Sequence, residues 1–150
     1  MGKSKKIRGD QIRFHKQKIA RKSRLKAAAA VRLADAEALL KAERFVGAVY
    51  LAGISLECAL KYAICEKQRI VDLHQKHPDL TAAKGHDLQV LLDRSGLGQR
   101  MSRSMHEDFV KIKVWNVGLR YNPTGGNVKD ARKFVARVRC IKEWIEGIVS

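Results

Sequence analysis

The sequence predicts an all-α protein, an up-and-down bundle of about five helices. Apolar residues recur at three- and four-residue spacing over several long stretches, whereas the alternation typical of strands is weak throughout. Both prolines and several glycines fall between these stretches, where they separate helices. With 150 residues, of which 45% are hydrophobic, the chain is long enough to bury a core as one domain.

The first two predicted helices are long. One spans about residues 23–43 and is rich in alanine and leucine, which favour helix. The next spans about residues 44–67 and is apolar on nearly every side, which is typical of the core helix of a bundle. It contains Glu57 near its middle and Lys61 one turn later. Because a charge at the centre of a bilayer costs about 2.5–3.5 kcal/mol, we predict a core helix and no membrane span.

A short third helix is predicted after a loop. Residues 69–85 are mostly polar and contain Pro78, so this stretch predicts a loop. The third helix then spans about residues 87–94. Asp87 suits its first position, because a carboxylate accepts hydrogen bonds from the free N–H groups of a helix start.

Two further helices complete the bundle. The fourth is predicted over about residues 105–119, with Ser102 or Ser104 as its N-cap. The Asn-Pro-Thr-Gly-Gly segment at residues 122–126 ends it. The last helix is predicted over about residues 128–149, where a regular apolar stripe lies on one side and basic residues lie mainly on the other.

The charge is strongly basic and unevenly distributed. The formal net charge of +16 favours an anionic partner, such as nucleic acid, a nucleotide or an anionic surface. Residues 1–26 hold eleven basic side chains against one acid. We therefore divide the chain into a basic arm, residues 1–24, partly disordered or helical, and a helical bundle, residues 25–150. The candidate phosphate-binding residues of the arm are Arg13, Lys16, Arg21, Lys22 and Arg24. The alternative for the arm is a solvated tail without a ligand.

The cysteines and the N-terminus indicate the compartment. Cys58, Cys65 and Cys140 form no disulfide framework, because their number is odd and the first two lie about two helical turns apart. We expect buried reduced thiols in a cytoplasmic protein. The arm also has the composition of an organelle transit peptide or a nuclear localisation sequence, and these alternatives stay open.

Four segments carry a family resemblance. They are YLAGISLECALK at residues 50–61, GHDL at residues 85–88, LRYNP at residues 119–123, and a final helix with Ala131, Ile141 and Trp144. In this order the chain resembles the HEPN domain, the "higher eukaryotes and prokaryotes nucleotide-binding" family, over about residues 25–149. The resemblance implies a helical bundle, often dimeric, that associates with RNA or nucleotides. It also implies a nucleotidyltransferase as partner, in a toxin–antitoxin-like pair.

Other HEPN proteins are metal-independent ribonucleases, whose active site is an Arg followed, after four to six residues, by a His. Here Arg120 is followed by no His through Asn127. Metal-free RNA cleavage needs a group that exchanges protons near neutral pH, so we predict no catalysis by the usual motif. Arg100 and His106 show the spacing elsewhere in the chain and are the weak catalytic candidates; a chance match is the alternative.

The resemblance places the candidate ligand site at Arg120 and Tyr121. Arg120 would contact phosphate and Tyr121 would stack on a base, within the groove of a homodimer. The structural alternative is a cation at a helix C-terminus beside a tyrosine at the edge of the core.

Glu57, Lys61 and His86 complete the set of candidate binding residues. Glu57 and Lys61 are spaced to form either an ion pair at a partly exposed edge or, in the groove, a pair that orients Arg120 or a phosphate. We predict Glu57 with Arg120 as the specific contact. For His86 we favour packing against the core helix, with a direct ligand role as the alternative.

No cofactor and no metal are expected. His74 and His77 have a three-residue spacing but lack the remaining ligands of a metal site, so we expect solvated side chains. The predicted function is RNA or nucleotide binding through the arm and the dimer groove. The alternatives are a metal-independent ribonuclease toxin and a protein-interaction module that partners a nucleotidyltransferase.

Overall fold

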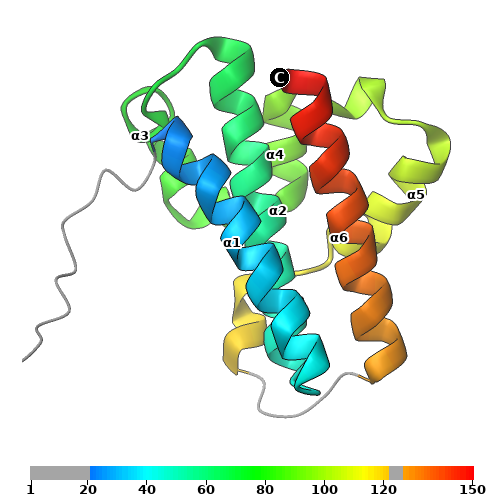
Figure 1. Ribbon diagram of the computed structural model, residues 1–150. Coiled ribbons are helices and arrows are strands. Elements are labelled where there is room, and N and C mark those ends of the chain that lie inside the picture. Colours follow the sequence, from blue (N-terminus) through cyan, green and yellow to red (C-terminus); the bar gives the residue numbers. More distant parts are fainter. Residues whose placement is uncertain (1–20, 122–126) are drawn as a thin grey trace, which may run out of the picture.

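Three long helices form the body of the protein. The structure, a computed structural model, describes residues 21–121 and 127–150. Figure 1 shows α1 (Lys22–Lys41) and α6 (Val128–Val149) running alongside α2 (Phe45–Gln68), which contacts both of them. Helices are the only regular elements over the described residues, so the all-α prediction is confirmed.

The remaining helices are short. They are α3 (Leu73–Lys76), η1 (Pro78–Thr81), η2 (Ala83–His86), α4 (Leu88–Ser95), η3 (Gly98–Arg100), α5 (Arg103–Ile112) and η4 (Val117–Tyr121). Of these, α4 and η4 pack against α2, and α5 packs against α6. The described elements thus surround α2, whose buried side chains form the centre of the core.

Burial of α2 follows from its sequence. Its alanines and leucines face α1, α4 and α6, and most of its residues from Ala52 to Cys65 are buried. The helix is long and apolar enough to cross a membrane by length and composition, but 72% of its most apolar window is buried within the protein. Its C-cap, Arg69, adopts the left-handed conformation that commonly terminates helices.

The first helix begins slightly earlier than expected. Lys22 is its first residue, and its Nζ lies 2.9 Å from Glu66 Oε1 of α2. This hydrogen bond lowers the pKa of the Glu66 carboxyl. The backbone N–H of Lys22 also donates to the carbonyl of Val71. The end of the predicted arm therefore belongs to α1, whereas Arg13 and Lys16 lie outside the described residues.

The prediction of a loop over residues 69–85 was wrong in part. This stretch folds into α3, η1 and η2, three single turns that the polar composition hid. Asp72 caps α3 by accepting from the N–H of His74, and Leu73 and Leu80 are fully buried. These two leucines anchor turns that are too short to show a helical period in the sequence.

The fourth helix ends earlier than predicted. It stops at Ile112, seven residues before Leu119, and η4 follows as a separate turn. Trp115 leaves the helix to stack on Tyr50, with ring centroids 6.2 Å apart, and covers Gly53 of α2. A Cβ at Gly53 would lie 2.0 Å from the indole ring, so glycine is needed for this approach.

The capping predictions are confirmed. Asp87 accepts from the N–H groups of Gln89 and Val90, Ser102 accepts from Met105, and the last helix has the predicted bounds. The cysteines are free, and burial raises the pKa of the Cys58 and Cys65 thiols to about 11. Cys65 is buried, Cys58 is half-buried and Cys140 is exposed, so the prediction of buried thiols was wrong for Cys140 and holds only in part for Cys58.

Candidate functional site

Two predicted site residues form a buried ion pair on α2. Lys61 Nζ lies 2.7 Å from Glu57 Oε1, and the two residues are only 8% and 5% exposed. The interpretation as a pair at a partly exposed edge was therefore wrong. A carboxylate and an ammonium withdrawn from water need each other, because either alone would carry a large desolvation penalty.

His86 supplies the second contact of this carboxylate. Its Nδ1 donates to Glu57 Oε2 across 3.0 Å, so both oxygens of Glu57 are bonded. The imidazole is 43% exposed, so it forms the outer edge of the cluster. The predicted partner, Arg120, has a side chain outside the described residues. We name Glu57, Lys61 and His86 the buried charge cluster; it confirms the predicted packing of His86 against the core helix.

Gly85 of η2 covers the buried charge cluster. A Cβ at this position would lie 1.8 Å from the carbonyl oxygen of Leu80 and 3.2 Å from Lys61 Nζ. Only a glycine lets η2 pass this close to the ammonium and to its own preceding turn. The GHDL segment thus has a local explanation: Gly85 permits the approach, His86 binds Glu57, and Asp87 caps α4.

A second set of charges is exposed at one end of the bundle. Figure 1 shows that α1 ends and α6 begins at this end, where η4 also lies. We name as the basic bundle end five exposed side chains, Lys41, Arg44, Lys129, Arg132 and Lys133. Lys41 and Arg132 line a shallow hollow together with Glu37 and Leu40, so α1 and α6 contribute to one surface.

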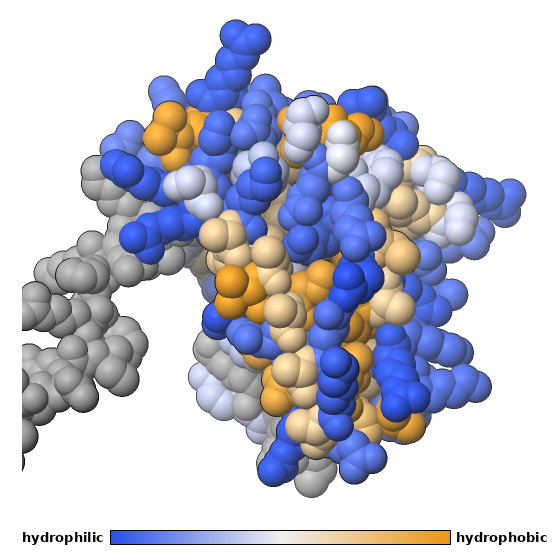
Figure 2. Space-filling view, in the orientation of Figure 1, coloured by the Kyte–Doolittle hydropathy of each residue, from blue (hydrophilic) through white to orange (hydrophobic). Residues whose placement is uncertain are grey.

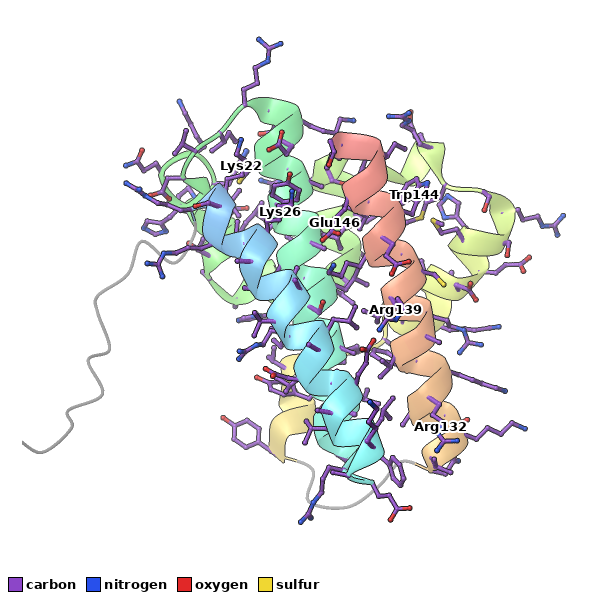
Figure 3. The ribbon with its side chains drawn as sticks, in the orientation of Figure 1. Lys22, Lys26, Arg132, Arg139, Trp144 and Glu146 are labelled. Atoms are coloured by element: carbon purple, nitrogen blue, oxygen red, sulfur yellow. The ribbon has the colours of Figure 1, made fainter. Side chains whose placement is uncertain are left out.

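The cations of the basic bundle end have no ion-pair partner among the described residues. The basic residues further along α6 are paired: Arg137 with Asp108 at 3.2 Å, Arg139 with Glu37 and Glu143, and Lys142 with Glu146 at 2.8 Å. Figure 3 shows Arg139 beside α1 and Arg132 closer to the start of α6. Along α6, Arg137 and the basic residues after it are therefore ion-paired, whereas those before it are not paired among the described residues.

The predicted pair Arg120 and Tyr121 lies in η4, at the same end of the bundle. Tyr121 is 75% exposed, which places its ring on the surface rather than in the core. The side chain of Arg120 is not among those the structure describes. The signal that marks the basic bundle end, cations at three- and four-residue steps on the polar face of the last helix, is visible in the sequence without any family pattern.

The remaining candidates lie elsewhere. His106 Nε2 donates to the carbonyl of Gly98 across 2.7 Å, which ties α5 to η3, the turn that contains Arg100. In the arm, Lys22 is paired with Glu66, and Arg21 and Arg24 are exposed. Figure 3 places Lys22 at the opposite end of the bundle from Arg132.

His74 is exposed, as expected for a solvated side chain, whereas His77 is half-buried, and both rings form hydrogen bonds within the protein. His74 Nδ1 bonds Thr81 Oγ1, and the two ring nitrogens of His77 bond Gln68 Oε1 and the guanidinium of Arg94. No group of three or more His, Cys, Asp or Glu side chains able to hold a metal ion occurs in the described part of the chain. The hydrogen bonds of these two rings therefore stabilise the short turns that follow α2.

Comparisons of the chain with family models, with curated proteins and with solved structures found no match.

Proposed function

We propose that this protein is a HEPN-like helical bundle that binds RNA, or the phosphates of a nucleotide-bearing partner, through an excess of surface cations. One observation carries the proposal: the carboxylates of the described chain are used within the fold, whereas many of its cations are not. Among the described acids only the Glu43 carboxylate forms no hydrogen bond or ion pair; the others bind a cation, an amide or a backbone N–H.

The unused cations are spread over the surface. Cations without an ion pair among the described residues include Arg21, Lys41, Arg44, Lys67, Arg69, Lys76, Lys84, Arg100, Lys111, Lys113, Lys129, Arg132 and Lys133; Lys26, which also has none, lies over the ring of Tyr62. Figure 2 shows hydrophilic residues over much of one face, with smaller hydrophobic areas between them. A surface of this kind attracts polyanions, and phosphate contacts supply most of the affinity for nucleic acid.

The HEPN resemblance adds the context of the proposal. It favours a cytoplasmic homodimer with a groove at Arg120 and Tyr121, and a nucleotidyltransferase as its partner in a toxin–antitoxin-like pair. We propose binding without the usual Arg and His chemistry, since no His follows Arg120. The ring nitrogen that His106 commits to Gly98 gives no support to the alternative of cleavage by Arg100 and His106.

Salt dependence tests the proposal. The full chain is titrated into a labelled, mixed-sequence single-stranded RNA over a range of KCl concentrations, and affinity is measured by fluorescence anisotropy. We expect log affinity to fall linearly with log salt, with a slope of about −0.7 for each phosphate contacted. A chain that begins at Arg21 should show a shallower slope, because seven basic residues precede Arg21. Absence of RNA binding at low salt would contradict the proposal.

Incubation of the same RNA with protein in EDTA tests the ribonuclease alternative. We expect intact RNA. Cleavage that disappears in His106→Ala would establish the alternative and overturn the proposal of binding without catalysis.

A further inference from the structure

We infer that the basic bundle end is the surface that holds the phosphodiester backbone of a nucleic-acid strand, and this rests on the proposed function. Among the described residues, cations without an ion pair are widespread, and at this end α1, α6 and the turn between α1 and α2 contribute five of them, two of which, Lys41 and Arg132, line a shared hollow. The net charge attracts any polyanion, whereas these particular cations would contact the phosphates directly.

The position of Lys129 is unfavourable for the helix that carries it. Lys129 lies in the first turn of α6, near the positive end of its dipole, and Arg132 and Lys133 follow in the second turn, where the effect of the dipole has fallen off. Cations stabilise a helix at its other end, as Lys41 does at the end of α1. The stability of α6 therefore does not explain these side chains, whereas contact with an anion does.

The opposite end of the bundle makes the contrast clear. Lys67 and Arg69 are also unpaired, but they lie at the C-terminus of α2, where a positive charge stabilises the helix. Their position is explained by the fold alone. The argument for a ligand therefore applies to the start of α6 and not to every exposed cation.

Geometry at the hollow supports a linear ligand. Lys129 and Lys133 are one turn apart on the exposed side of α6, and Arg132, between them in sequence, reaches the hollow shared with Lys41. The acid of this hollow, Glu37, is paired with Arg139, so its charge is compensated within the protein. A strand that crosses from α6 to α1 would meet Arg132 and Lys41 at the hollow, with two exposed acids nearby in the sequence, Asp130, which bonds Asn127, and Glu43.

The test compares two full-length variants with the same loss of charge. The first carries Lys129→Gln, Arg132→Gln and Lys133→Gln; the control carries Arg103→Gln, Lys111→Gln and Lys113→Gln in and after α5, where the side chains are also exposed and Arg103 forms a surface ion pair with Glu107. Both are titrated into the labelled single-stranded RNA and into DNA of the same sequence. Circular dichroism melting verifies that both are folded.

We expect the α6 variant to lose about two units of the salt slope, which corresponds to three phosphate contacts on a single strand. The α5 control should keep the wild-type slope, and RNA and DNA should respond alike, because backbone contacts carry no base information. A fully charged variant, Lys129→Arg with Lys133→Arg, should also keep the slope.

Two results would overturn the inference. If wild-type protein binds RNA but the α6 variant keeps the wild-type slope, the contacts lie elsewhere, and the proposed function stands without this surface. If the α5 control loses as much slope as the α6 variant, only net charge matters and no surface is selected. Failure of wild-type protein to bind either strand would instead remove the proposed function, and this inference with it.

Discussion

The buried charge cluster and the basic bundle end both contain basic side chains, but these side chains serve different purposes in the two regions. In the cluster, Lys61 and His86 both bond one carboxylate, and its three members satisfy one another. At the basic bundle end, Lys129 and Arg132 form no ion pair with a carboxylate among the described residues. Charges that a protein satisfies internally fix its own shape, whereas charges left unsatisfied at the surface remain available to a ligand. The two regions should therefore respond in opposite ways to substitution.

The largest effect is expected from removing the charge at the centre of the cluster. Glu57→Gln leaves the buried ammonium of Lys61 without its counter-ion and turns an amide donor toward another donor. We expect a loss of about 3–5 kcal/mol in the free energy of unfolding, measured by urea denaturation. The matched control is Glu43→Gln, at the exposed carboxylate without a described partner, where we expect a change within about 0.5 kcal/mol. Similar losses in both would refute the contrast.

A smaller loss is expected from crowding the cover of the cluster. Gly85→Ala places a Cβ 1.8 Å from the backbone oxygen of Leu80, so η2 must shift away from Lys61. We expect a loss of about 1–3 kcal/mol, as for other overpacked sites, measured by thermal denaturation. In Gly147→Ala, where a Cβ would meet nothing within 4 Å, the helix should instead gain about 0.5–1 kcal/mol. Equal effects at both glycines would contradict the close approach at η2.

Removing the outer member of the cluster should cost less. His86→Ala deletes one of two hydrogen bonds to Glu57 while the buried ion pair remains, so we expect a loss of about 1 kcal/mol in the free energy of unfolding. Urea denaturation at pH 7 measures it. A loss as large as that in Glu57→Gln would mean that the imidazole, and not Lys61, carries most of the stabilisation.

The smallest effect on stability is expected at the basic bundle end. Replacing Lys129, Arg132 and Lys133 by Gln removes cations from the unfavourable end of the α6 dipole, so stability should be unchanged or rise by up to about 1 kcal/mol. Chemical denaturation of the variant used for RNA binding measures this directly. A clear loss of stability would show that these side chains serve the fold, which would erase the difference between the two regions.

Residue spacing and side-chain type predicted most helices well, but they did not predict the contacts between segments distant in sequence. The bounds of α6, the capping role of Asp87 and the core character of α2 all follow from spacing and side-chain type. The early end of α5 does not, because it depends on Trp115 crossing to Gly53, a residue far away in sequence. No local pattern encodes a contact between distant segments.

The same limit applies to the candidate site. The spacing of Glu57 and Lys61 correctly predicted a pair, but its burial depends on η2, which the sequence presented as an exposed loop. The third member, His86, was recognised through the GHDL segment, although its bond to Glu57 was not foreseen. The cations at the start of α6 could be read as a basic face, but the contribution of Lys41 required the fold.

The arrangement of α1, α2 and α6 also has a consequence for the order in which the protein assembles. Residues 42–44 alone join α1 to α2, so these two helices can pair early as a hairpin. Before α6 can dock on α2, the chain must close a loop across residues 69–127, a slower event. We therefore expect the start of α6 and the end of α1 to come together after α1 and α2 have paired, and pulse-labelled hydrogen exchange should show α6 protected after α1. Until then, the cations that share the hollow belong to separate segments, and any ligand that bridges them would bind the finished bundle better than its folding intermediates.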